Sequence, residues 1–506
     1  MNTPAWVSDA IFYQIFPDRF AKSERATKQG LNLEPWNTPP TIYGFKGGDL
    51  RGVTEHLDYI KDLGANAIYF TPVFASASNH RYHTYDYYNV DPLLGGNEAL
   101  RELLDTAHKK NIRVTLDGVF NHASRGFWQF HHTLENGAAS PYVDWFHFDP
   151  DRLNGKRHWG AYPSPEEQQA IQREGSYKAI GYQGWWNLPA LPKFNTQTPA
   201  VREFIFNVAE YWIKFGIDGW RLDVPGEIDD DSFWREFRRR VKSINPEAYI
   251  VGEIWHDARR WLQGDQFDAS MNYLVTAACI SFFTGKHLDL NETLKSGGYQ
   301  GYISHIDANE FANRIDSILG MYHPDVTRVQ LNLLDSHDTP RFLTCAGRDL
   351  NSLKLALMFI FTYPGAPCIF YGDEIGLYGR HDPECRQPFP WDESKWDHNL
   401  RGFVKDLIAL RKAHPALRGD GSYQKVYVAD SVYVFKRESK SETILIALNA
   451  SEAARKINLD EINFGDVLSR SKGQGKNRIL FGQDDLEFEK ESIRLNIPPR
   501  SGVVLK

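Results

Sequence analysis

The sequence predicts an α/β protein: a (β/α)8 barrel with a subdomain inserted after the third strand and an antiparallel β-sandwich at the C-terminal end. Three observations support this prediction. Short apolar runs alternate eight times with polar residues and helical patterns. A long interval rich in aromatic residues follows the third run. Beyond about residue 415 the pattern changes to short alternating segments separated by turn residues.

The eight apolar runs have the length and composition of buried parallel strands. In chain order they are Ile11–Phe16, Ala67–Phe70, Ile112–Leu116, Gly219–Leu222, Tyr249–Val251, Phe267–Met271, Arg328–Leu333 and Cys368–Tyr371. Between the third and fourth runs, apolar residues recur at helical spacing from Ala200 to Lys214, which predicts an amphipathic helix. Eight strand–helix repeats favour a closed parallel barrel, although the count alone also permits a doubly wound open sheet.

The interval from Asn121 to about Pro199 defines the inserted subdomain. It is far longer than the usual βα loop of about 2–6 residues, and it is rich in Trp, Tyr, His, Pro and Gly. We therefore expect the barrel to occupy residues 1–120 and 200–415, with subdomain B over 121–199. The C-terminal β-sandwich is expected over 416–506. Its candidate strands are Lys425–Ala429, Val432–Phe435, Thr443–Leu448 and Val503–Lys506.

The composition excludes several kinds of partner. The 506 residues include 58 Lys and Arg against 65 Asp and Glu, and this formal charge of −7 provides no basic surface for nucleic acid. No run approaches the roughly 18 apolar residues of a membrane span. The first ten residues lack the features of a leader peptide, and the four cysteines lack the spacing of a zinc site or the density of a disulfide scaffold. We expect a cytoplasmic protein with free thiols, whose oligomeric state these features do not predict.

Aromatic residues make up 14% of the chain, and several lie among glycine and polar residues, as in Gly184–Asn187. Flat apolar rings beside hydrogen-bonding groups suit the faces of sugars. The alternative is that these rings belong to the core or its rim. A neutral or small polar substrate fits both the charge and this aromatic content.

Three acidic residues are candidate catalytic groups because they follow barrel strands. In (β/α)8 enzymes the catalytic side chains lie at the carboxyl ends of the strands. Asp223 ends the fourth run, Glu253 ends the fifth, and Asp338 follows the seventh. Each could be an ordinary surface or capping carboxylate when taken alone, but three at strand ends indicate a shared site.

Glycosidic bond cleavage explains why such a site would need several carboxylates. One ionised group attacks or stabilises an oxocarbenium-like centre, while a second carries a proton for the leaving oxygen. Arg221 lies two residues before Asp223, so both side chains face the same side of the strand. A permanent cation there would favour an ionised Asp223. The alternative for this pair is a purely structural ion pair in the barrel.

Four motifs resemble the successive sequence regions of the α-amylase superfamily, glycoside hydrolase family 13, in order and spacing. They are Asp117–His122, Gly219–Asp223, Glu253–His256 and Ser336–Thr339. Further matches are Gly44–Leu50, Leu191–Asn195, Gly365–Pro367 and Tyr371–Glu374, so the resemblance covers residues from about 11 to 415. Leu191–Asn195 and Glu227 are similar to the neopullulanase, cyclomaltodextrinase and maltogenic amylase branch, and a glucan debranching enzyme is a further candidate.

The resemblance implies a TIM-barrel enzyme and assigns roles to particular residues. Asp223 would be the nucleophile, Glu253 the general acid/base, and Asp338 the group that holds sugar hydroxyls and stabilises the transition state. His122 and His337 would bond the sugar above Tyr82, and Trp255 would border the acceptor side. The substrate-binding set that the resemblance implies is Tyr82, His122, Arg221, Trp255, His337, Asp382 and Arg386. A histidine is often only structural, but His122 and His337 each adjoin a motif at a strand end.

Among the departures from the family pattern, two bear on substrate choice and metal binding. Members of the branch usually carry an N-terminal β-sandwich, whereas the first barrel strand is expected here near Ile11. An open barrel mouth and a preference for debranching are expected to follow. Related enzymes also have a calcium loop rich in Asn and Asp after the first strand, whereas Lys22–Gln29 offers few oxygen ligands and adds positive charge. No metal or other cofactor is therefore expected.

The expected function is retaining hydrolysis of α-1,4 and also α-1,6 glucosidic bonds. The expected substrates are α-glucans such as malto-oligosaccharides, cyclodextrins, pullulan and branched glucans. One alternative is a transglycosylase or a sugar isomerase on the same barrel. Another is a non-catalytic carbohydrate-binding subunit, which would require a lost carboxylate or a membrane helix.

Overall fold

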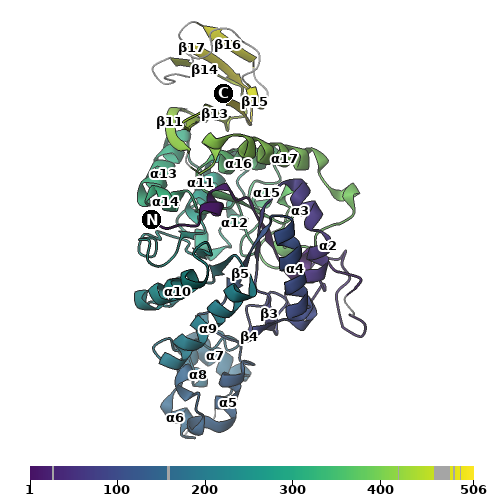
Figure 1. Ribbon diagram of the computed structural model, residues 1–506, viewed down its shortest axis with the longest axis vertical. Coiled ribbons are helices and arrows are strands. Elements are labelled where there is room, and N and C mark those ends of the chain that lie inside the picture. The colour runs from purple at the N-terminus through teal and green to yellow at the C-terminus, as the bar shows by residue number, and fades with distance from the viewer. Residues whose placement is uncertain (26–27, 156–159, 420, 461–478, 483–484, 490–491) are drawn as a thin grey trace.

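The computed structural model describes residues 1–506 except 26–27, 156–159, 420, 461–478, 483–484 and 490–491. Figure 1 shows three parts along the long axis of the molecule. The barrel lies in the middle, the inserted subdomain with helices α5 to α8 lies at one end, and the C-terminal sheets lie at the other. No helix in the described part of the chain is long and apolar enough to span a bilayer.

Eight parallel strands form the barrel. They are β1 (Phe12–Ile15), β2 (Ala67–Phe70), β5 (Arg113–Gly118), β6 (Gly219–Leu222), β7 (Tyr249–Gly252), β8 (Ala269–Ser270), β9 (Leu331–Asn332) and β10 (Ala366–Phe370). Their order is β8-β7-β6-β5-β2-β1-β10-β9, and a parallel bridge between Met271 and Leu331 joins the two end strands. The sheet is therefore a closed barrel, as predicted, and not a doubly wound open sheet.

Every barrel strand overlaps a predicted apolar run, and β2 and β6 coincide with theirs. The largest differences are at β8 and β9, which have two residues each where longer runs were predicted. Phe267, Val329 and Leu333 flank these strands and are buried without belonging to them. An apolar run indicates which residues are buried, and the buried residues extend beyond those that form hydrogen bonds between strands.

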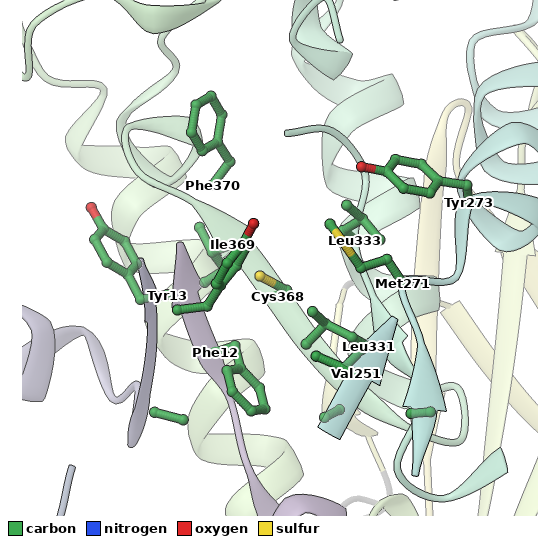
Figure 2. Packing of buried hydrophobic residues seen from close by; sticks show 14 of the residues in the cluster. Phe12, Tyr13, Val251, Met271, Tyr273, Leu331, Leu333, Cys368, Ile369 and Phe370 are labelled. Atoms are coloured by element: carbon green, nitrogen blue, oxygen red, sulfur yellow. The ribbon is translucent and has the colours of Figure 1, made fainter. Parts of the chain in front are cut away.

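The barrel interior is filled by side chains. Figure 2 shows Phe12, Val251, Met271, Leu331 and Cys368 converging from different strands of the sheet. All five are buried, with exposed fractions of at most 3%. The barrel is thus a packed core, and any substrate site has to lie at its rim.

Helices surround the barrel. They are α1 (Pro17–Phe20), α2 (Leu50–Glu55), α3 (Leu57–Leu63), α4 (Gly96–Lys109), α9 (Pro199–Phe215), α10 (Asp231–Ile244), α11 (Tyr273–Phe283), α12 (Leu290–Thr293), α13 (Ala308–Met321), α14 (Pro324–Thr327), α15 (Phe342–Cys345), α16 (Leu350–Thr362) and α17 (His398–Ala413). Helix α9 exceeds the predicted amphipathic helix by one residue at each end. Its buried stripe includes Val201, Ile205, Val208 and Trp212, which recur every three or four residues and face the barrel.

The inserted subdomain follows β5, as predicted, and contains α5 (Trp128–Asn136), α6 (Pro150–Leu153), α7 (Pro165–Glu174) and α8 (Ser176–Ile180). Many of its aromatic rings form its own core. Phe130 packs edge-on against Phe146 and Tyr182, with ring centroids 5.0 Å and 4.9 Å away. For these rings the core interpretation of the aromatic content is correct. A hairpin of β3 (Phe74–Ser76) and β4 (Thr84–Val90) after β2 was not predicted.

The described residues of the C-terminal part form two antiparallel sheets. Their strands are β11 (Ser422–Ala429), β12 (Val432–Glu438), β13 (Thr443–Asn449), β14 (Arg455–Asp460), β15 (Ile479–Phe481), β16 (Asp485–Glu489), β17 (Ser492–Ile497) and β18 (Ser501–Leu505). One sheet has the order β11-β12-β13-β18-β15 and the other β14-β17-β16. Val434 and Val503 of the first sheet share a buried cluster with Leu459 and Leu495 of the second. This packing confirms the predicted sandwich.

Candidate active site

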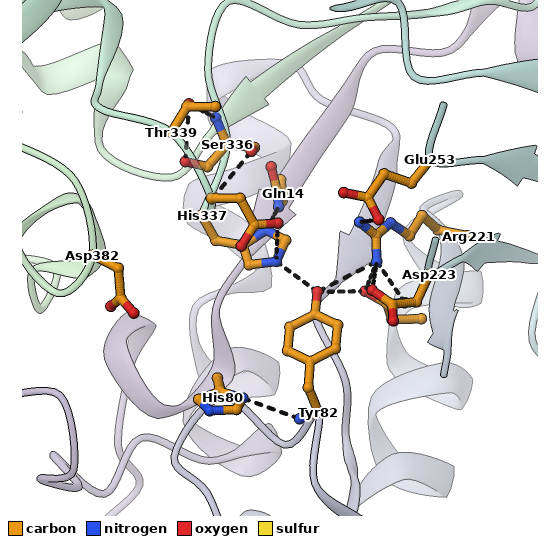
Figure 3. Close-up of polar contacts among 12 residues, drawn as sticks. Gln14, His80, Tyr82, Arg221, Asp223, Glu253, Ser336, His337, Thr339 and Asp382 are labelled. Atoms are coloured by element: carbon orange, nitrogen blue, oxygen red, sulfur yellow. Dashed lines mark hydrogen bonds and ion pairs between the residues drawn. The ribbon is translucent and has the colours of Figure 1, made fainter. Parts of the chain in front are cut away.

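The predicted carboxylates meet at one rim of the barrel. Asp223 directly follows β6, Glu253 directly follows β7, and Asp338 lies in the loop after β9. Because the strands are parallel, their carboxyl ends open at the same rim. Figure 3 shows Asp223 and Glu253 beside Arg221, and Asp382 well apart from them.

One guanidinium joins three carboxylates. Nη1 of Arg221 lies 2.9 Å and 2.8 Å from the two carboxylate oxygens of Asp117 and 3.0 Å from Oδ1 of Asp223. Nη2 of Arg221 lies 2.9 Å from Oε2 of Glu253. Arg221 and Asp117 are fully buried, and Asp223 and Glu253 are each 6% exposed. Carboxyl groups from adjacent strands are thus held on neighbouring nitrogens of one cation.

Asp117 was not predicted as a site residue, although its motif was noted. It lies on β5 directly opposite Arg221 on β6, because the parallel register pairs these two residues. Its Oδ2 also accepts hydrogen bonds from Tyr82 at 2.9 Å and from Tyr69 at 3.2 Å. Its position near the carboxyl end of the third apolar run was the sequence signal that could have identified it.

Glu253 is held by two further donors. The indole Nε1 of Trp255 donates to Oε1 of Glu253 at 3.0 Å, and the backbone N–H of Val224 donates to Oε2 at 3.0 Å. The Trp255 ring also stacks on Tyr273, with ring centroids 3.7 Å apart and planes 5° apart. One face of Trp255 is therefore covered by protein, and its polar edge points at Glu253.

Asp338 has a different environment. Its carboxylate lies 3.0 Å from Nε2 of His337 and 3.2 Å from Nη2 of Arg386, and it is partly exposed. Arg386 also donates from Nε to the carbonyl oxygen of His337 at 2.7 Å and pairs with Asp382 at 3.2 Å. Asp382 thus reaches the rest of the site through Arg386.

Burial controls the protonation of the carboxylates beside Arg221. Burial raises the pKa of Asp223 well above its ordinary value and also raises the pKa of Glu253. Arg221 lowers the pKa of each group, as predicted for Asp223, but offsets only part of the burial effect. Burial acts on Asp338 too, yet His337 and Arg386 outweigh it and hold the pKa of Asp338 well below its usual range.

His337 and Tyr82 form one polar unit. The Tyr82 ring stacks on the His337 ring, with planes 6° apart, and its hydroxyl contacts Nε2 of His337. On the other side of the histidine, the Gln14 amide nitrogen lies 2.9 Å from Nδ1. Gln14 was not predicted, although it is the one polar residue within the first apolar run. Figure 3 shows this chain of contacts from Gln14 through His337 and Tyr82 toward Arg221.

His122 follows β5 and is buried. Burial lowers the pKa of His122 to about 3, so its imidazole is neutral near pH 7. Its Nε2 has no hydrogen-bond partner among the described residues. A neutral ring nitrogen without a partner remains available to a ligand hydroxyl.

The loop between β1 and α2 does not fit a calcium ion. The Lys28 ammonium contacts the carbonyl oxygen of Gly47 and Oδ2 of Asp49. The fully buried Lys46 ammonium lies 2.9 Å from the carbonyl oxygen of Pro35 and 2.8 Å from that of Thr38. In the described part of this loop, four oxygen atoms of the kind that could hold a metal therefore already bond to lysine ammonium groups. Among the described residues, no cluster of three or more His, Cys, Asp or Glu could hold a metal.

Two family models together match nearly the whole chain. The α-amylase catalytic domain family matches residues 14–420, and the α-amylase C-terminal domain family matches residues 421–505. A cyclomaltodextrinase of Geobacillus thermopakistaniensis is 41% identical over 98% of this chain and 77% of its own length. Neopullulanase 2 of Thermoactinomyces vulgaris is 38% identical over 100% of this chain and 78% of its own length.

A solved structure supports the same grouping. The debranching enzyme of Nostoc punctiforme is 47% identical, with a TM-score of 0.86 over 99% of each chain. The match extends over the barrel, the inserted subdomain and the C-terminal sheets. The chain belongs to the α-amylase family, glycoside hydrolase family 13, in the branch of cyclomaltodextrinases, neopullulanases and maltogenic amylases.

Proposed function

We propose that the chain is a retaining hydrolase that cleaves α-1,4 and α-1,6 glucosidic bonds of α-glucans. The observation that carries this proposal is the placement of Asp223 and Glu253 on neighbouring nitrogens of Arg221. A retaining glycosidase requires two carboxyl groups only about 5–5.5 Å apart, one to attack and one to transfer a proton. The names of the relatives support α-glucans as the substrate class.

In the first step, Asp223 attacks the anomeric carbon while Glu253 gives its proton to the leaving oxygen. The glycosidic bond breaks and a covalent glycosyl ester forms on Asp223. In the second step, Glu253 takes a proton from water, and the water oxygen displaces Asp223 from the same carbon. Two displacements restore the original anomeric configuration. Oδ2 of Asp223 has no partner among the described residues, which leaves an oxygen for the attack.

The charge balance favours this division of roles. Asp117, Asp223, Glu253 and Asp338 supply four carboxyl groups, whereas Arg221 and Arg386 are the guanidinium groups that contact them. Burial raises the pKa of both Asp223 and Glu253, which favours a proton shared within the group. Because Glu253 raises the pKa of Asp223 more than any other carboxylate does, a proton on Glu253 is the one that best leaves Asp223 ionised. We assign the shared proton to Glu253, the general acid.

The surrounding residues would bind the sugar at the cleavage point. Asp338, held ionised by its contacts with His337 and Arg386, would accept hydrogen bonds from two sugar hydroxyls. His122 and His337 would bond further hydroxyls, and Tyr82 would pack against the sugar ring. Arg386 and Asp382 would meet the next sugar of the chain. Trp255 keeps Glu253 in place through its indole N–H and borders the acceptor side.

One digestion experiment tests the proposal. Pullulan, γ-cyclodextrin and amylopectin are incubated separately with the protein, and the products are separated by chromatography. We expect short malto-oligosaccharides from γ-cyclodextrin, and from pullulan products that require cleavage of each linkage type. Release of linear chains from amylopectin would indicate debranching. No product from any α-glucan would contradict the proposal. Longer products at high maltose concentration would instead favour the transglycosylase alternative.

We propose that the protein works in the cytoplasm, because all four cysteines are buried free thiols.

We propose that subdomain B covers residues 121–199 and that the sandwich covers residues 416–506. Limited proteolysis followed by mass spectrometry tests them. Stable fragments that end near residue 415 would support the second boundary, and cleavage inside β13 would contradict it.

A further inference from the structure

A column of stacked rings leads from the candidate site to the surface of the inserted subdomain. The His122 ring stacks on Trp185, with ring centroids 4.8 Å apart and planes 7° apart. Trp185 in turn stacks on Trp186, with centroids 4.5 Å apart and planes 18° apart. The column begins at a buried histidine of the site and ends at a tryptophan that is 73% exposed.

The backbone holds this tryptophan outward in an unfavourable conformation. Trp186 and Asn187 both have left-handed backbone angles, with φ of 50° and 61°. Bulky residues rarely adopt this conformation, because their Cβ atoms crowd the backbone. Local hydrogen bonds fix it: Oδ1 of Asn187 accepts from the Ser176 N–H at 2.9 Å, and the Trp185 N–H donates to the Leu191 carbonyl oxygen at 2.9 Å. A strained turn that exposes a large ring is typical of a ligand contact.

The middle ring of the column offers an unused hydrogen-bond donor. Nε1 of Trp185 is buried and has no partner among the described residues. A buried indole N–H usually finds an acceptor, so a donor left unsatisfied next to Trp186 is unusual. Leu188, two residues beyond Trp186, adds exposed apolar surface. Flat apolar faces beside a free donor match a sugar, which presents C–H groups on its faces and hydroxyl oxygens at its edges.

We infer that the exposed face of Trp186 is an outlying glucose-binding platform for an α-glucan chain whose scissile bond lies at the Asp223–Glu253 pair. This inference rests on the proposed function. The platform lies at the outer end of the column, beyond His122 and Trp185, so we expect chains that extend well past the cleavage point to reach it. Its contacts do not change during the reaction, because the bound sugar is remote from the breaking bond. They therefore lower KM for long substrates and leave kcat unchanged.

Two substitutions of Trp186 test the platform. Trp186→Ala removes the ring, and Trp186→Asn removes it while supplying a residue that tolerates the left-handed backbone. For maltoheptaose we expect KM to rise about five- to tenfold in both variants, with kcat unchanged, as for loss of one aromatic contact. For maltotriose we expect no change in either constant. Trp128→Ala is the matched control, since Trp128 is 62% exposed on α5 of the same subdomain and lies outside the column.

Several outcomes would overturn the inference. KM for maltoheptaose equal to that of the wild type in both Trp186 variants would do so. An equal loss on maltotriose and maltoheptaose would also do so, because the ring would then support the cleavage point itself. Binding of maltoheptaose, followed by tryptophan fluorescence, separates this inference from the proposed function. If the wild type binds but does not hydrolyse α-glucans, the proposed function fails, and weaker binding by Trp186→Asn still supports the platform.

Discussion

Asp223 and Asp338 are predicted to affect stability in opposite directions when their charges are removed. Asp223 is buried, its pKa is raised well above the ordinary value, and its Oδ2 has no partner among the described residues. Its ionisation therefore costs folding free energy near neutral pH. Asp223→Asn keeps the shape and the contact with Arg221 but removes this cost. Asp338 is instead stabilised in its ionised form by His337 and Arg386, so Asp338→Asn loses a favourable ion pair with Arg386.

The sign follows from linkage between protonation and folding. The pKa of Asp223 is higher in the folded state, so the folding free energy that protonated Asp223 contributes at acid pH is lost as the pH rises through that pKa. Asp223→Asn prevents this loss, because asparagine does not ionise. We expect a gain of about 1–2 kcal/mol near pH 7, as for relief of a strained functional site, and about 10^4-fold lower kcat. The pKa of Asp338 is lower in the folded state than in the unfolded state, so ionised Asp338 stabilises the fold at pH values above the unfolded-state pKa. Asp338→Asn removes this stabilisation. That variant should have a lower Tm near pH 7.

Differential scanning calorimetry at pH 7 and pH 4 measures both effects, with kcat on maltoheptaose as the activity readout. We expect Tm to rise by a few degrees for Asp223→Asn at pH 7 and the gain to shrink at pH 4. Asp338→Asn serves as the matched control, because it removes a carboxylate from the same site. If both substitutions shift Tm in the same direction at pH 7, the electrostatic account of the site is wrong.

Three further predictions follow from the contacts of the site and the β1–α2 loop. The product first released from an α-glucan should be the α-anomer by proton NMR, and prompt β-anomer would exclude double displacement. The hydrogen bond from Trp255 lowers the pKa of Glu253, so Trp255→Phe should raise that pKa. The alkaline limb of the kcat–pH profile should then move to higher pH. An unchanged limb would exclude Glu253 as the general acid. EDTA should leave the Tm of the wild type unchanged, because the Lys28 ammonium already bonds the oxygen atoms of the loop. The Tm of Lys28→Ala should be a few degrees lower, and millimolar Ca²⁺ should restore part of this difference. A wild-type Tm that falls in EDTA would contradict this interpretation.

The barrel strands could be predicted because buried parallel strands are continuous apolar runs. The same reasoning located Asp223, Glu253 and Asp338, since the residue that ends such a run lies at the barrel rim. Asp117 directly follows the third run, Ile112–Leu116, so its position was visible in the sequence, but its contact with Arg221 depends on the register with the neighbouring strand. A single sequence does not reveal which residues face each other across strands.

Features set by long-range packing were also beyond sequence reasoning. Arg221 lowers the pKa of Asp223, as expected, but three carboxylates share this cation, and burial raises that pKa by more than Arg221 lowers it. The calcium loop was recognised as atypical from its lysines. The Lys28 ammonium contacts Gly47 and Asp49 only because the loop folds back on itself. Spacing along the chain does not encode such contacts.

Trapping of the glycosyl ester tests the central claim most directly. The protein is incubated with 5-fluoro-α-glucosyl fluoride, which forms the ester quickly and hydrolyses it slowly, and is then digested with trypsin. Residues 222–235 form the tryptic peptide that contains Asp223, since the chain has Arg at 221 and 235. We predict a mass increase of one fluoroglucosyl group on this peptide, placed on Asp223 by fragmentation. A label on Glu253 or Asp338, or inactivation without any labelled carboxylate, would contradict the assignment of Asp223 as the nucleophile.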